Sequence, residues 1–206
     1  MSRQTSDLTR FFRNSDHFET LEHIVLPDLI AHSGLPPGLR AWSAGCSTGE
    51  EAFTLAMLLE ELLPKRLERS IIAVDRSRDA IAAARRGRYP AAAVEGVPRL
   101  YRKRYFRPVE GGLEVIPEVR RQVSFAVASL ESYEPKSQFQ LVLCRNVLTY
   151  ADEEGKKAII DRLWRGMADY SYLLVGGAET QLGYDDRFEY LECEWTSYYR
   201  KRVEAE

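Results

Sequence analysis

Two glycines and an acid are the residues of this sequence best placed to bind a small molecule. Gly45 and Gly49 lie in the turn at residues 43–51, between a short apolar run and a segment with helical periodicity, and Asp75 ends the next apolar run. A strand that continues through such a turn into a helix presents backbone N–H groups, and an acid at the tip of the next strand can accept hydrogen bonds from a ribose. Because the turn is neither G-x-G-x-x-G nor a Lys-containing phosphate loop, it favours a nucleoside without a pyrophosphate.

The same turn also has a purely structural explanation. Ser47-x-x-Glu50 and Thr48-x-x-Glu51 both match the capping box, in which a hydroxyl and an acid cap the start of a helix reciprocally. Two such caps would account for these side chains without any ligand. Asp75 adds weight to the binding interpretation only through its pairing with the turn, because an acid that ends a strand is usually just solvated.

Apolar spacing around the turn predicts alternating strands and helices. Ala52, Leu55, Leu59 and Leu63 recur on one face of a helix that begins near Glu50. The other expected elements are strands at residues 39–43, 71–75, 123–127, 140–144 and 172–175, and helices at residues 16–33, 77–86 and 152–167. Strands that alternate with helices imply an α/β fold with a mostly parallel sheet covered on both faces.

Two segments break this alternation and predict antiparallel pairing. Residues 104–116 predict a hairpin around Gly111 and Gly112, and residues 188–191 with residues 197–201 predict a terminal pair of strands.

The first helix is expected to be amphipathic and to begin at a capping box formed by Asp16 and Glu19. Its three histidines, His17, His23 and His32, are scattered along it and are expected on its surface.

Composition excludes several classes of protein. The 206 residues include 29 basic and 31 acidic ones, so net charge gives no reason to expect binding to nucleic acid or to anionic lipid. The three cysteines, Cys46, Cys144 and Cys193, are far apart and predict neither a disulfide framework nor a metal site, and Cys144 is expected to be a buried apolar residue. The longest apolar stretch is far shorter than the roughly 20 residues that span a bilayer. We therefore expect a cytoplasmic protein that holds no metal.

Seven short motifs occur in a fixed order along the chain. They are Thr9-Arg10-Phe11-Phe12-Arg13, Trp42-Ser43-Ala44-Gly45-Cys46-Ser47-Thr48-Gly49-Glu50-Glu51, Ala73-Val74-Asp75, Arg86-Gly87-Arg88-Tyr89, Arg104-Tyr105-Phe106, Cys144-Arg145-Asn146-Val147-Leu148-Thr149-Tyr150 and Gly176-Gly177-Ala178-Glu179. Together they resemble the catalytic domain of the chemotaxis receptor glutamate methyltransferases, the CheR family. The resemblance implies a class I, Rossmann-like S-adenosylmethionine methyltransferase fold that methylates glutamates on the cytoplasmic helices of a chemoreceptor.

The resemblance also implies a domain organisation and a set of site residues. An N-terminal helical segment, residues 1–34, would pack on a methyltransferase domain, residues 35–206, which carries a small β-subdomain at about residues 104–122. By matched position the S-adenosylmethionine pocket would contain Asp7, Thr9, Arg13, Ala44, Gly45, Glu51, Asp75, Ser129, Leu130, Asn146 and Val147. Arg13 and Tyr150 would lie nearest the transferred methyl group.

This chemistry explains why the sequence has no histidine-centred triad. A glutamate carboxylate has a reference pKa of about 4.3, so at neutral pH the nucleophile is already ionised and needs no general base. Arg13 can bind a carboxylate of substrate or cofactor, and Tyr150 can donate a hydrogen bond to one. Positioning the reacting groups is then the main task left to the protein.

The sequence departs from the family pattern at several positions. Asp7 stands where the family has Asn, and Ser129 stands where the pattern reads Asn-Leu; both changes alter hydrogen bonding to the cofactor. Residues 169–171 replace the glycine turn that precedes the strand at Leu173, which predicts a changed loop there. The short hairpin loop at residues 108–112 predicts that no receptor tail peptide docks there with high affinity.

Because the first motif, at Thr9, lies almost at the start of the sequence, we expect the helical domain with which family members bind receptors to be missing. We expect either that a separate chain supplies it to reach the chemoreceptor or that the methyl acceptor is another protein or a small molecule. A third alternative is a noncatalytic module that binds S-adenosylmethionine or its product, S-adenosylhomocysteine, and signals to a partner.

Overall fold

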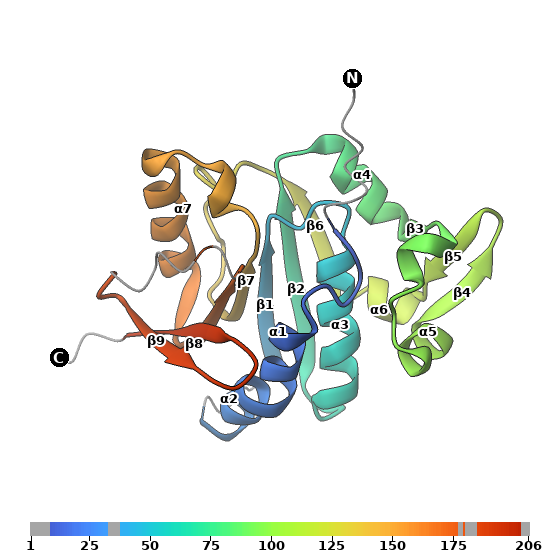
Figure 1. Cartoon of the computed structure of the whole chain (residues 1–206), viewed down its shortest axis with the longest axis horizontal. Helices are drawn as coiled ribbons and strands as arrows, with labels where there is room; N and C mark the ends of the chain where they lie inside the picture. Colours follow the sequence, from blue (N-terminus) through green and yellow to red (C-terminus); the bar gives the residue numbers. More distant parts are fainter. Residues whose placement is uncertain (1–8, 33–37, 177–178, 180–184, 203–206) are drawn as a thin grey trace.

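The computed structural model describes residues 9–32, 38–176, 179 and 185–202. Its centre is a seven-stranded sheet with the strand order β6-β2-β1-β7-β8-β10-β9 (Figure 1). Its strands are β1 (Gly38–Ala44), β2 (Glu68–Asp75), β6 (Val123–Val127), β7 (Phe139–Cys144), β8 (Met167–Val175), β9 (Phe188–Glu192) and β10 (Ser197–Lys201).

Five neighbouring strands of this sheet run parallel. β1 pairs with β2 and β7, β2 pairs with β6, and β7 pairs with β8, whereas β10 is antiparallel to both β8 and β9. The expected parallel sheet and the expected terminal antiparallel pair are confirmed. The strand order reverses at β1, because β2 lies on one side of it and the much later β7 lies on the other. In open α/β sheets, ligands bind beyond the carboxyl ends of the strands at such a reversal.

Helices cover both faces of the sheet, and each face has its own hydrophobic core. α3 (Glu50–Leu62) contributes Leu55 and Leu59 to one core. α7 (Glu153–Gly166) contributes Leu163 to the other. The parallel strands consist of nearly continuous apolar runs because their side chains are buried on both faces.

The N-terminal helical segment packs into the same core as α3. It comprises α1 (Ser15–Thr20), a π-helical turn, η2 (Leu21–Val25), and α2 (Leu26–His32), which follow one another without a break. The expected capping box is wrong. The residue before the helix is Asn14, whose φ of 58° is left-handed and whose side chain makes no cap hydrogen bond.

His17 is buried, which corrects the expectation of three surface histidines. His23 and His32 are exposed, but the His17 side chain is only 3% exposed, and its Nδ1 has no hydrogen-bond partner among the described residues. Burial, together with the positive charge of Arg145, lowers the pKa of His17 from 6.5 to about 4. The imidazole is therefore neutral at pH 7.

A second sheet is antiparallel, has three strands in the order β3-β5-β4, and lies beside α3 on the side away from α7 (Figure 1). The elements of this region are α4 (Arg78–Arg86), β3 (Arg88–Tyr89), η3 (Ala91–Val94), α5 (Arg99–Tyr105), β4 (Phe106–Val109), β5 (Gly112–Val115) and α6 (Pro117–Arg120). The expected hairpin forms as β4 and β5, but Arg104 and Tyr105 end α5 and do not belong to it. β3 was not expected, because a two-residue strand shows no alternation.

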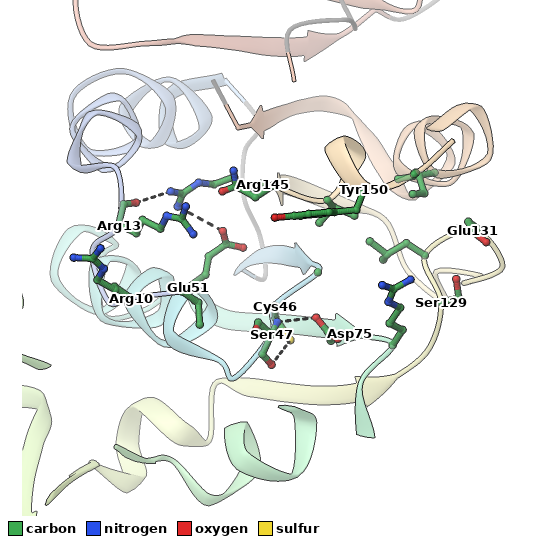
Figure 2. A pocket seen from close by; sticks show the side chains of 18 residues that line it. Arg10, Arg13, Cys46, Ser47, Glu51, Asp75, Ser129, Glu131, Arg145 and Tyr150 are labelled. Atoms are coloured by element: carbon green, nitrogen blue, oxygen red, sulfur yellow. Dashed lines mark hydrogen bonds and ion pairs between the residues drawn. The ribbon is translucent and has the colours of Figure 1, made fainter. Parts of the chain in front are cut away.

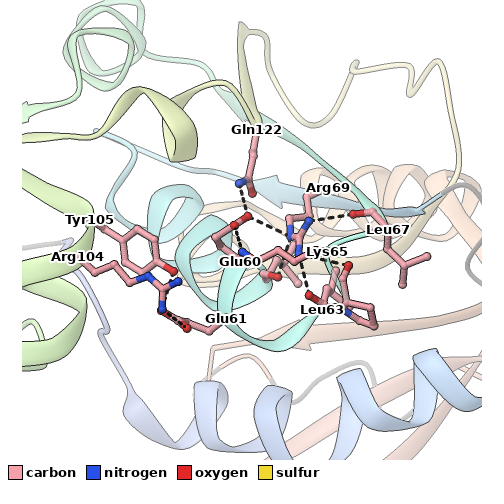
Figure 3. Close-up of polar contacts among 11 residues, drawn as sticks. Glu60, Glu61, Leu63, Lys65, Leu67, Arg69, Arg104, Tyr105 and Gln122 are labelled. Atoms are coloured by element: carbon pink, nitrogen blue, oxygen red, sulfur yellow. Dashed lines mark hydrogen bonds and ion pairs between the residues drawn. The ribbon is translucent and has the colours of Figure 1, made fainter.

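Glu61, near the end of α3, joins this small subdomain to the main sheet (Figure 3). Arg104 donates from Nη1 to both carboxylate oxygens of Glu61 at 2.9 Å, and the Tyr105 hydroxyl donates to Oε1 at 2.7 Å. Beside it, the Arg69 guanidinium donates to the carbonyl oxygens of Leu59 and Leu63 at 2.9 and 2.7 Å. Arg69 thus adds hydrogen bonds at the C-terminal end of α3, where the carbonyl oxygen of Leu59 also accepts from the N–H of Leu63 at 3.1 Å.

β8 begins directly after α7, which corrects the expected loop at residues 169–171. Asp152 caps α7, since its side chain accepts from the N–H of Gly155 at 2.8 Å, and the helix ends at Gly166. Asp169, Tyr170 and Ser171 lie inside β8 and not in a turn before it. The Tyr170 and Tyr172 hydroxyls donate to Asp28 of α2 at 2.6 and 2.5 Å and so tie the strand to the N-terminal segment.

Within the described ranges, no helix has both the length and the apolar character that a membrane crossing requires. No three or more His, Cys, Asp or Glu side chains in the same ranges are grouped so that they could hold a metal ion. Cys46, Cys144 and Cys193 are free thiols, and Cys144 is fully buried, as expected.

Candidate functional site

A cavity of about 270 Å³ opens beyond the carboxyl ends of β1, β2 and β7, where the strand order reverses (Figure 2). Its lining residues are Thr9, Arg10, Arg13, Gly45, Cys46, Ser47, Glu51, Asp75, Arg76, Ser129, Leu130, Glu131, Arg145, Asn146, Val147, Tyr150, Ala151 and Ile159. They come from the segments after the four neighbouring strands β6, β2, β1 and β7, from the start of α3, from the middle of α7 and from the segment before α1.

The turn after β1 needs glycine for two reasons. Gly45 has a φ of 86°, and a Cβ built on it would lie 2.2 Å from Cγ2 of Val147 across the cavity floor. Gly49 has a φ of 96°, and a Cβ there would lie 2.8 Å from Cβ of Ala84. Ser47, between them, also has a positive φ, 48°. The backbone is therefore held in a left-handed, strained conformation where the cavity begins.

The double capping box expected at this turn does not form. The N-cap of α3 is Gly49, and no side chain caps the helix. Instead the Thr48 hydroxyl lies 2.9 and 2.7 Å from the two oxygens of Glu50, and the Ser43 hydroxyl donates to Oε1 of Glu51 at 2.6 Å. Glu50 and Glu51 thus interact with hydroxyl side chains. A reciprocal cap therefore does not explain the turn.

Asp75, at the end of β2, holds the turn from the neighbouring strand (Figure 2). Its Oδ2 accepts from the N–H of Ser47 at 2.8 Å, and its Oδ1 accepts from the N–H of Ser77 at 2.8 Å. Because each carboxylate oxygen can accept more than one hydrogen bond, the carboxylate keeps capacity for a hydroxyl donor in the cavity.

A wall of the cavity comes from residues 9–14, which we call the wall segment. Its side chains face two sides. Arg10 and Arg13 line the cavity, while Phe11 packs edge-on against Tyr89 and Phe106, with ring centroids 4.8 and 5.1 Å away. The N–H of Phe12 donates to the Thr54 hydroxyl of α3 at 3.2 Å. The aromatic contacts anchor the segment on one side and leave its two arginines on the other.

Arg145 joins the wall segment to the start of α3 (Figure 2). It donates from Nη2 to the carbonyl oxygen of Arg13 at 2.5 Å, and its Nη1 lies 3.5 Å from Oε2 of Glu51. The guanidinium is centred 5.5 Å from the ring of Phe18 of α1, and its side chain is 3% exposed. Burial lowers the pKa of Arg145 and raises that of Glu51, each opposed by the charge of the other group.

The loop after β7 is shaped by Asn146, whose φ is 59°. Its N–H donates to Oε2 of Glu179 at 2.7 Å, and the N–H of Thr149 donates to Oε1 at 3.2 Å. The loop continues into a short 3-10 turn, η4 (Leu148–Tyr150), which ends at Tyr150. The Tyr150 side chain is 69% exposed at the edge of the cavity, so its hydroxyl is accessible to an acceptor molecule.

The structure gathers nearly all the expected site residues around this one cavity. Those that line it are Thr9, Arg13, Gly45, Glu51, Asp75, Ser129, Leu130, Asn146, Val147 and Tyr150. Ala44 does not; its side chain is fully buried in the core on the α7 face. Asp7 lies outside the described residues.

Sequence reasoning missed Arg145, although it lies inside a quoted motif. It also missed the lining residues Arg10, Cys46, Ser47, Arg76, Glu131, Ala151 and Ile159. Arg10, Cys46 and Ser47 were within motifs and could have been found from them. Ile159 follows from no motif, because it reaches the cavity from the middle of α7.

Comparison with known proteins now assigns the chain. Residues 7–197 match the family described as "CheR methyltransferase, SAM binding domain". The chain belongs to the CheR methyltransferase family. S-adenosylmethionine (SAM) is therefore its cofactor, and a CheR-family SAM methyltransferase is what the sequence resemblance had indicated.

Three relatives are each longer than the part that matches this chain. Chemotaxis protein methyltransferase 1 of Pseudomonas aeruginosa is 34% identical over 206 residues, which cover 96% of this chain and 75% of that protein. Chemotaxis protein methyltransferase Cher2 of Pseudomonas putida is 32% identical over 199 residues, covering 92% and 71%. A 104.1 kDa protein of Rhodobacter capsulatus is 34% identical over 190 residues, which cover 90% of this chain but only 20% of that protein.

A solved structure supports the CheR fold assignment. The N-methyltransferase NodS from Bradyrhizobium japonicum superposes with a TM-score of 0.50 at 14% identity, covering 94% of this chain and 100% of that chain. Together with the family match, this likeness identifies the seven-stranded, mostly parallel sheet as that of a class I SAM methyltransferase, and in this chain a small antiparallel subdomain accompanies it.

The residues of the CheR cavity fit SAM by their chemistry. Asp75 can accept from the ribose hydroxyls, and Leu130, Val147 and Ile159 offer apolar contacts to a planar base. The amino-acid end of SAM carries both an ammonium and a carboxylate, and the cavity presents Glu51 for the first and arginines for the second. The cavity therefore contains side chains of opposite sign to each of these two charged groups.

Proposed function

We propose that this CheR-family protein forms methyl esters on glutamate side chains of the cytoplasmic helices of a chemoreceptor. The observation that carries the proposal is the charge and acid–base character of the cavity. Arginines 10, 13, 76 and 145 line it, and none of its described lining residues is a histidine or a lysine. A site with surplus positive charge and no base that titrates near pH 7 suits an acceptor that arrives already negative.

The side chains of Cys46, Glu51 and Asp75, which also line the cavity, offer no free base near pH 7. Burial and nearby acids raise the pKa of the Cys46 thiol well above its usual range, so it stays protonated. The carboxylate of Glu51 is engaged by the Ser43 hydroxyl, and that of Asp75 by two backbone N–H groups. An ionised carboxylate, with a reference pKa of about 4.3, needs no proton removed before it acts as a nucleophile.

Arg13 and Tyr150 are the residues we assign to the acceptor. Bound SAM would supply a methyl group on a positively charged sulfur. Arg13 lines the cavity beside Glu51, while Tyr150 lies at its exposed edge (Figure 2). The guanidinium can bind the acceptor carboxylate and the phenol can donate a hydrogen bond to it, so together they hold one oxygen toward the cavity. Thr9, Gly45, Glu51, Asp75, Ser129, Leu130, Asn146 and Val147 are assigned to the cofactor.

The experiment that tests this proposal is methyl transfer from labelled SAM to purified chemoreceptor cytoplasmic fragments. Glutamate methyl esters release volatile labelled methanol in alkali, which is the expected result. Alkali-stable label would contradict the glutamate assignment and indicate another methyl acceptor. Binding of S-adenosylhomocysteine without transfer to a receptor fragment or to a cell extract would indicate a noncatalytic SAM-binding module. A receptor partner also agrees with the names of the Pseudomonas relatives, both chemotaxis methyltransferases.

A further inference from the structure

Glu179 is a buried acid for which neither the sequence nor the proposed reaction gives a role. Its side chain is 3% exposed, and the cavity lining does not include it. Its carboxylate nevertheless contacts the backbone just after the ends of two strands. Gly176 follows β8, and Asn146 follows β7, and both donate backbone hydrogen bonds to the same carboxylate oxygen.

Among the described residues, every hydrogen bond of this carboxylate comes from a donor. Oε2 accepts from the N–H of Asn146 at 2.7 Å and from the N–H of Gly176 at 2.8 Å. Oε1 accepts from the N–H of Thr149 at 3.2 Å and lies 3.4 Å from the Thr149 hydroxyl. Backbone donors to a charged acceptor make stronger hydrogen bonds than those to a neutral one. A carboxylate is also the side chain that can accept at both oxygens and present no donor of its own.

The contacts fix the one part of the loop whose conformation is unfavourable. Asn146 has a left-handed φ of 59°, and both Asn146 and Val147 are assigned to the cofactor. The 3-10 turn that follows starts within the span of these hydrogen bonds and ends at Tyr150. Strained backbone of this kind persists only where surrounding contacts determine it.

The surroundings of Gly176 show how closely the segments that carry Gly176, Glu179 and Asn146 pack together. A Cβ built on Gly176 would lie 2.7 Å from Oε2 of Glu179 and 3.1 Å from the backbone nitrogen of Asn146. Since no side chain fits there, the carboxylate can approach both strand ends at once. The geometry also offers a second way to disturb the contact while leaving the acid in place.

We propose that Glu179 is a positioning residue, which holds the loop after β7 so that Asn146 and Val147 meet the cofactor and Tyr150 meets the acceptor. Its effect on cofactor binding rests on the family assignment, and its effect on Tyr150 rests on the proposed function. The two effects can be measured separately, because binding of S-adenosylhomocysteine needs no methyl acceptor.

The test uses Glu179→Gln in the full chain, with Glu114→Gln as a matched control. Glu114 is equally buried, 3% exposed, and is held by several arginines, but it lies in the small subdomain away from the cavity. The amide of Gln would turn a donor toward one of the N–H groups that the carboxylate now accepts from. We expect Glu179→Gln to weaken S-adenosylhomocysteine binding about tenfold or more by calorimetry, and Glu114→Gln to leave it unchanged.

Hydrogen exchange separates local positioning from general stability. In Glu179→Gln the amides of Asn146, Thr149 and Gly176 should exchange about tenfold or more faster, while amides of β1 and β2 keep their protection. In a methylation assay with receptor fragments, kcat should fall at saturating cofactor while the KM for acceptor changes little. If affinity is unchanged, or if exchange accelerates equally throughout the sheet, the proposal is overturned.

Gly176→Ala gives an independent variant if Glu179→Gln fails to fold. It keeps the carboxylate but places a methyl group in contact with it, so the same loss of affinity and the same local exchange are expected. Wild-type affinity in Gly176→Ala would overturn the proposal. If the variants show the expected changes in affinity and exchange but the wild type does not methylate receptor fragments, the result would instead count against the proposed acceptor.

Discussion

The guanidinium of Arg145 donates to the carbonyl oxygen of Arg13 while its other terminal nitrogen lies 3.5 Å from Glu51. One buried cation therefore connects the wall segment, the start of α3 and the loop after β7. Its own Nε has no hydrogen-bond partner among the described residues, so the side chain is held by these two contacts and by the ring of Phe18. The shape of the cavity between those three segments depends on it.

Arg145→Met should both destabilise the protein and weaken cofactor binding. The variant keeps the length of the side chain, frees the wall segment and leaves Glu51 without its cation. Removing one partner of a buried pair costs about 3 kcal/mol, measured as a loss in the free energy of unfolding by urea titration. The matched control is Arg121→Met, which breaks an exposed pair with Glu118 and should cost less than about 1 kcal/mol. Equal stability of the two variants would contradict this prediction.

Gly45→Ala should abolish detectable binding of S-adenosylhomocysteine. The new Cβ meets Cγ2 of Val147, and its positive φ alone costs about 1–2 kcal/mol. Calorimetry on Gly45→Ala and on Gly45→Ala/Val147→Ala tests the mechanism, because shortening Val147 removes the clash but not the φ penalty. Partial recovery in the double variant is expected. Gly96→Ala, where an added Cβ meets nothing within 4 Å, should bind as wild type does.

His17 should make the protein less stable in mild acid. Its pKa is about 4 in the folded protein and 6.5 as a free side chain. Above pH 6.5 both states are neutral and its full contribution to stability is present. As the pH falls from 6.5 to 4, the unfolded chain binds a proton that the folded chain does not, and about 3 kcal/mol of stability is lost.

Urea unfolding at several pH values measures this effect. His17→Phe cannot take up that proton, so its free energy of unfolding should fall less between pH 7 and pH 4.5 than that of the wild type. His23→Phe is the control, because the His23 side chain is half exposed and pairs with Glu19 at the surface. If His17→Phe keeps the wild-type pH dependence, the buried histidine is not its source.

Tyr150→Phe should slow methyl transfer without affecting stability. The side chain is 69% exposed, so loss of the hydroxyl should change the free energy of unfolding by less than about 0.5 kcal/mol. The lost hydrogen bond to the acceptor should lower kcat about tenfold or more, with little change in S-adenosylhomocysteine affinity. Tyr190→Phe removes a comparably exposed hydroxyl from the far edge strand β9 and should retain full activity. Normal kcat in Tyr150→Phe would remove Tyr150 from the catalytic assignment.

The position of the cavity could be predicted from the sequence because its main residues follow strands. Gly45, Asp75 and Asn146 come directly after or at the end of three apolar runs, and parallel strands bring their carboxyl ends to one edge. Local patterns were enough for this, since the strands are short, buried and continuous. The residue types within the motifs indicated the cofactor, which the spacing of the residues alone left open.

The elements that were missed depend on partners far away in the chain. His17 looks like a surface residue because its burial comes from packing against later segments and from the neighbourhood of Arg145. The polar residues Asp169 and Ser171 interrupt the apolar pattern that would predict a strand here. The strand is held by β10, some 30 residues later, and by Asp28 of α2. A local pattern cannot show such long-range contacts.

The small subdomain is inserted into the chain as one continuous piece. It leaves the main sheet after α4 and returns before β6, and its two ends are close, since the N–H of Val115 donates to the carbonyl oxygen of Gly87 at 2.9 Å. Between Arg76 and Ser129 no described residue lines the cavity. Tyr89 and Phe106 contact Phe11, and Tyr101 contacts Phe12, so these three rings link the small subdomain to the wall segment. A homologue could therefore exchange this insertion for a different one, and with it the surface offered to a partner, provided that those three rings were kept.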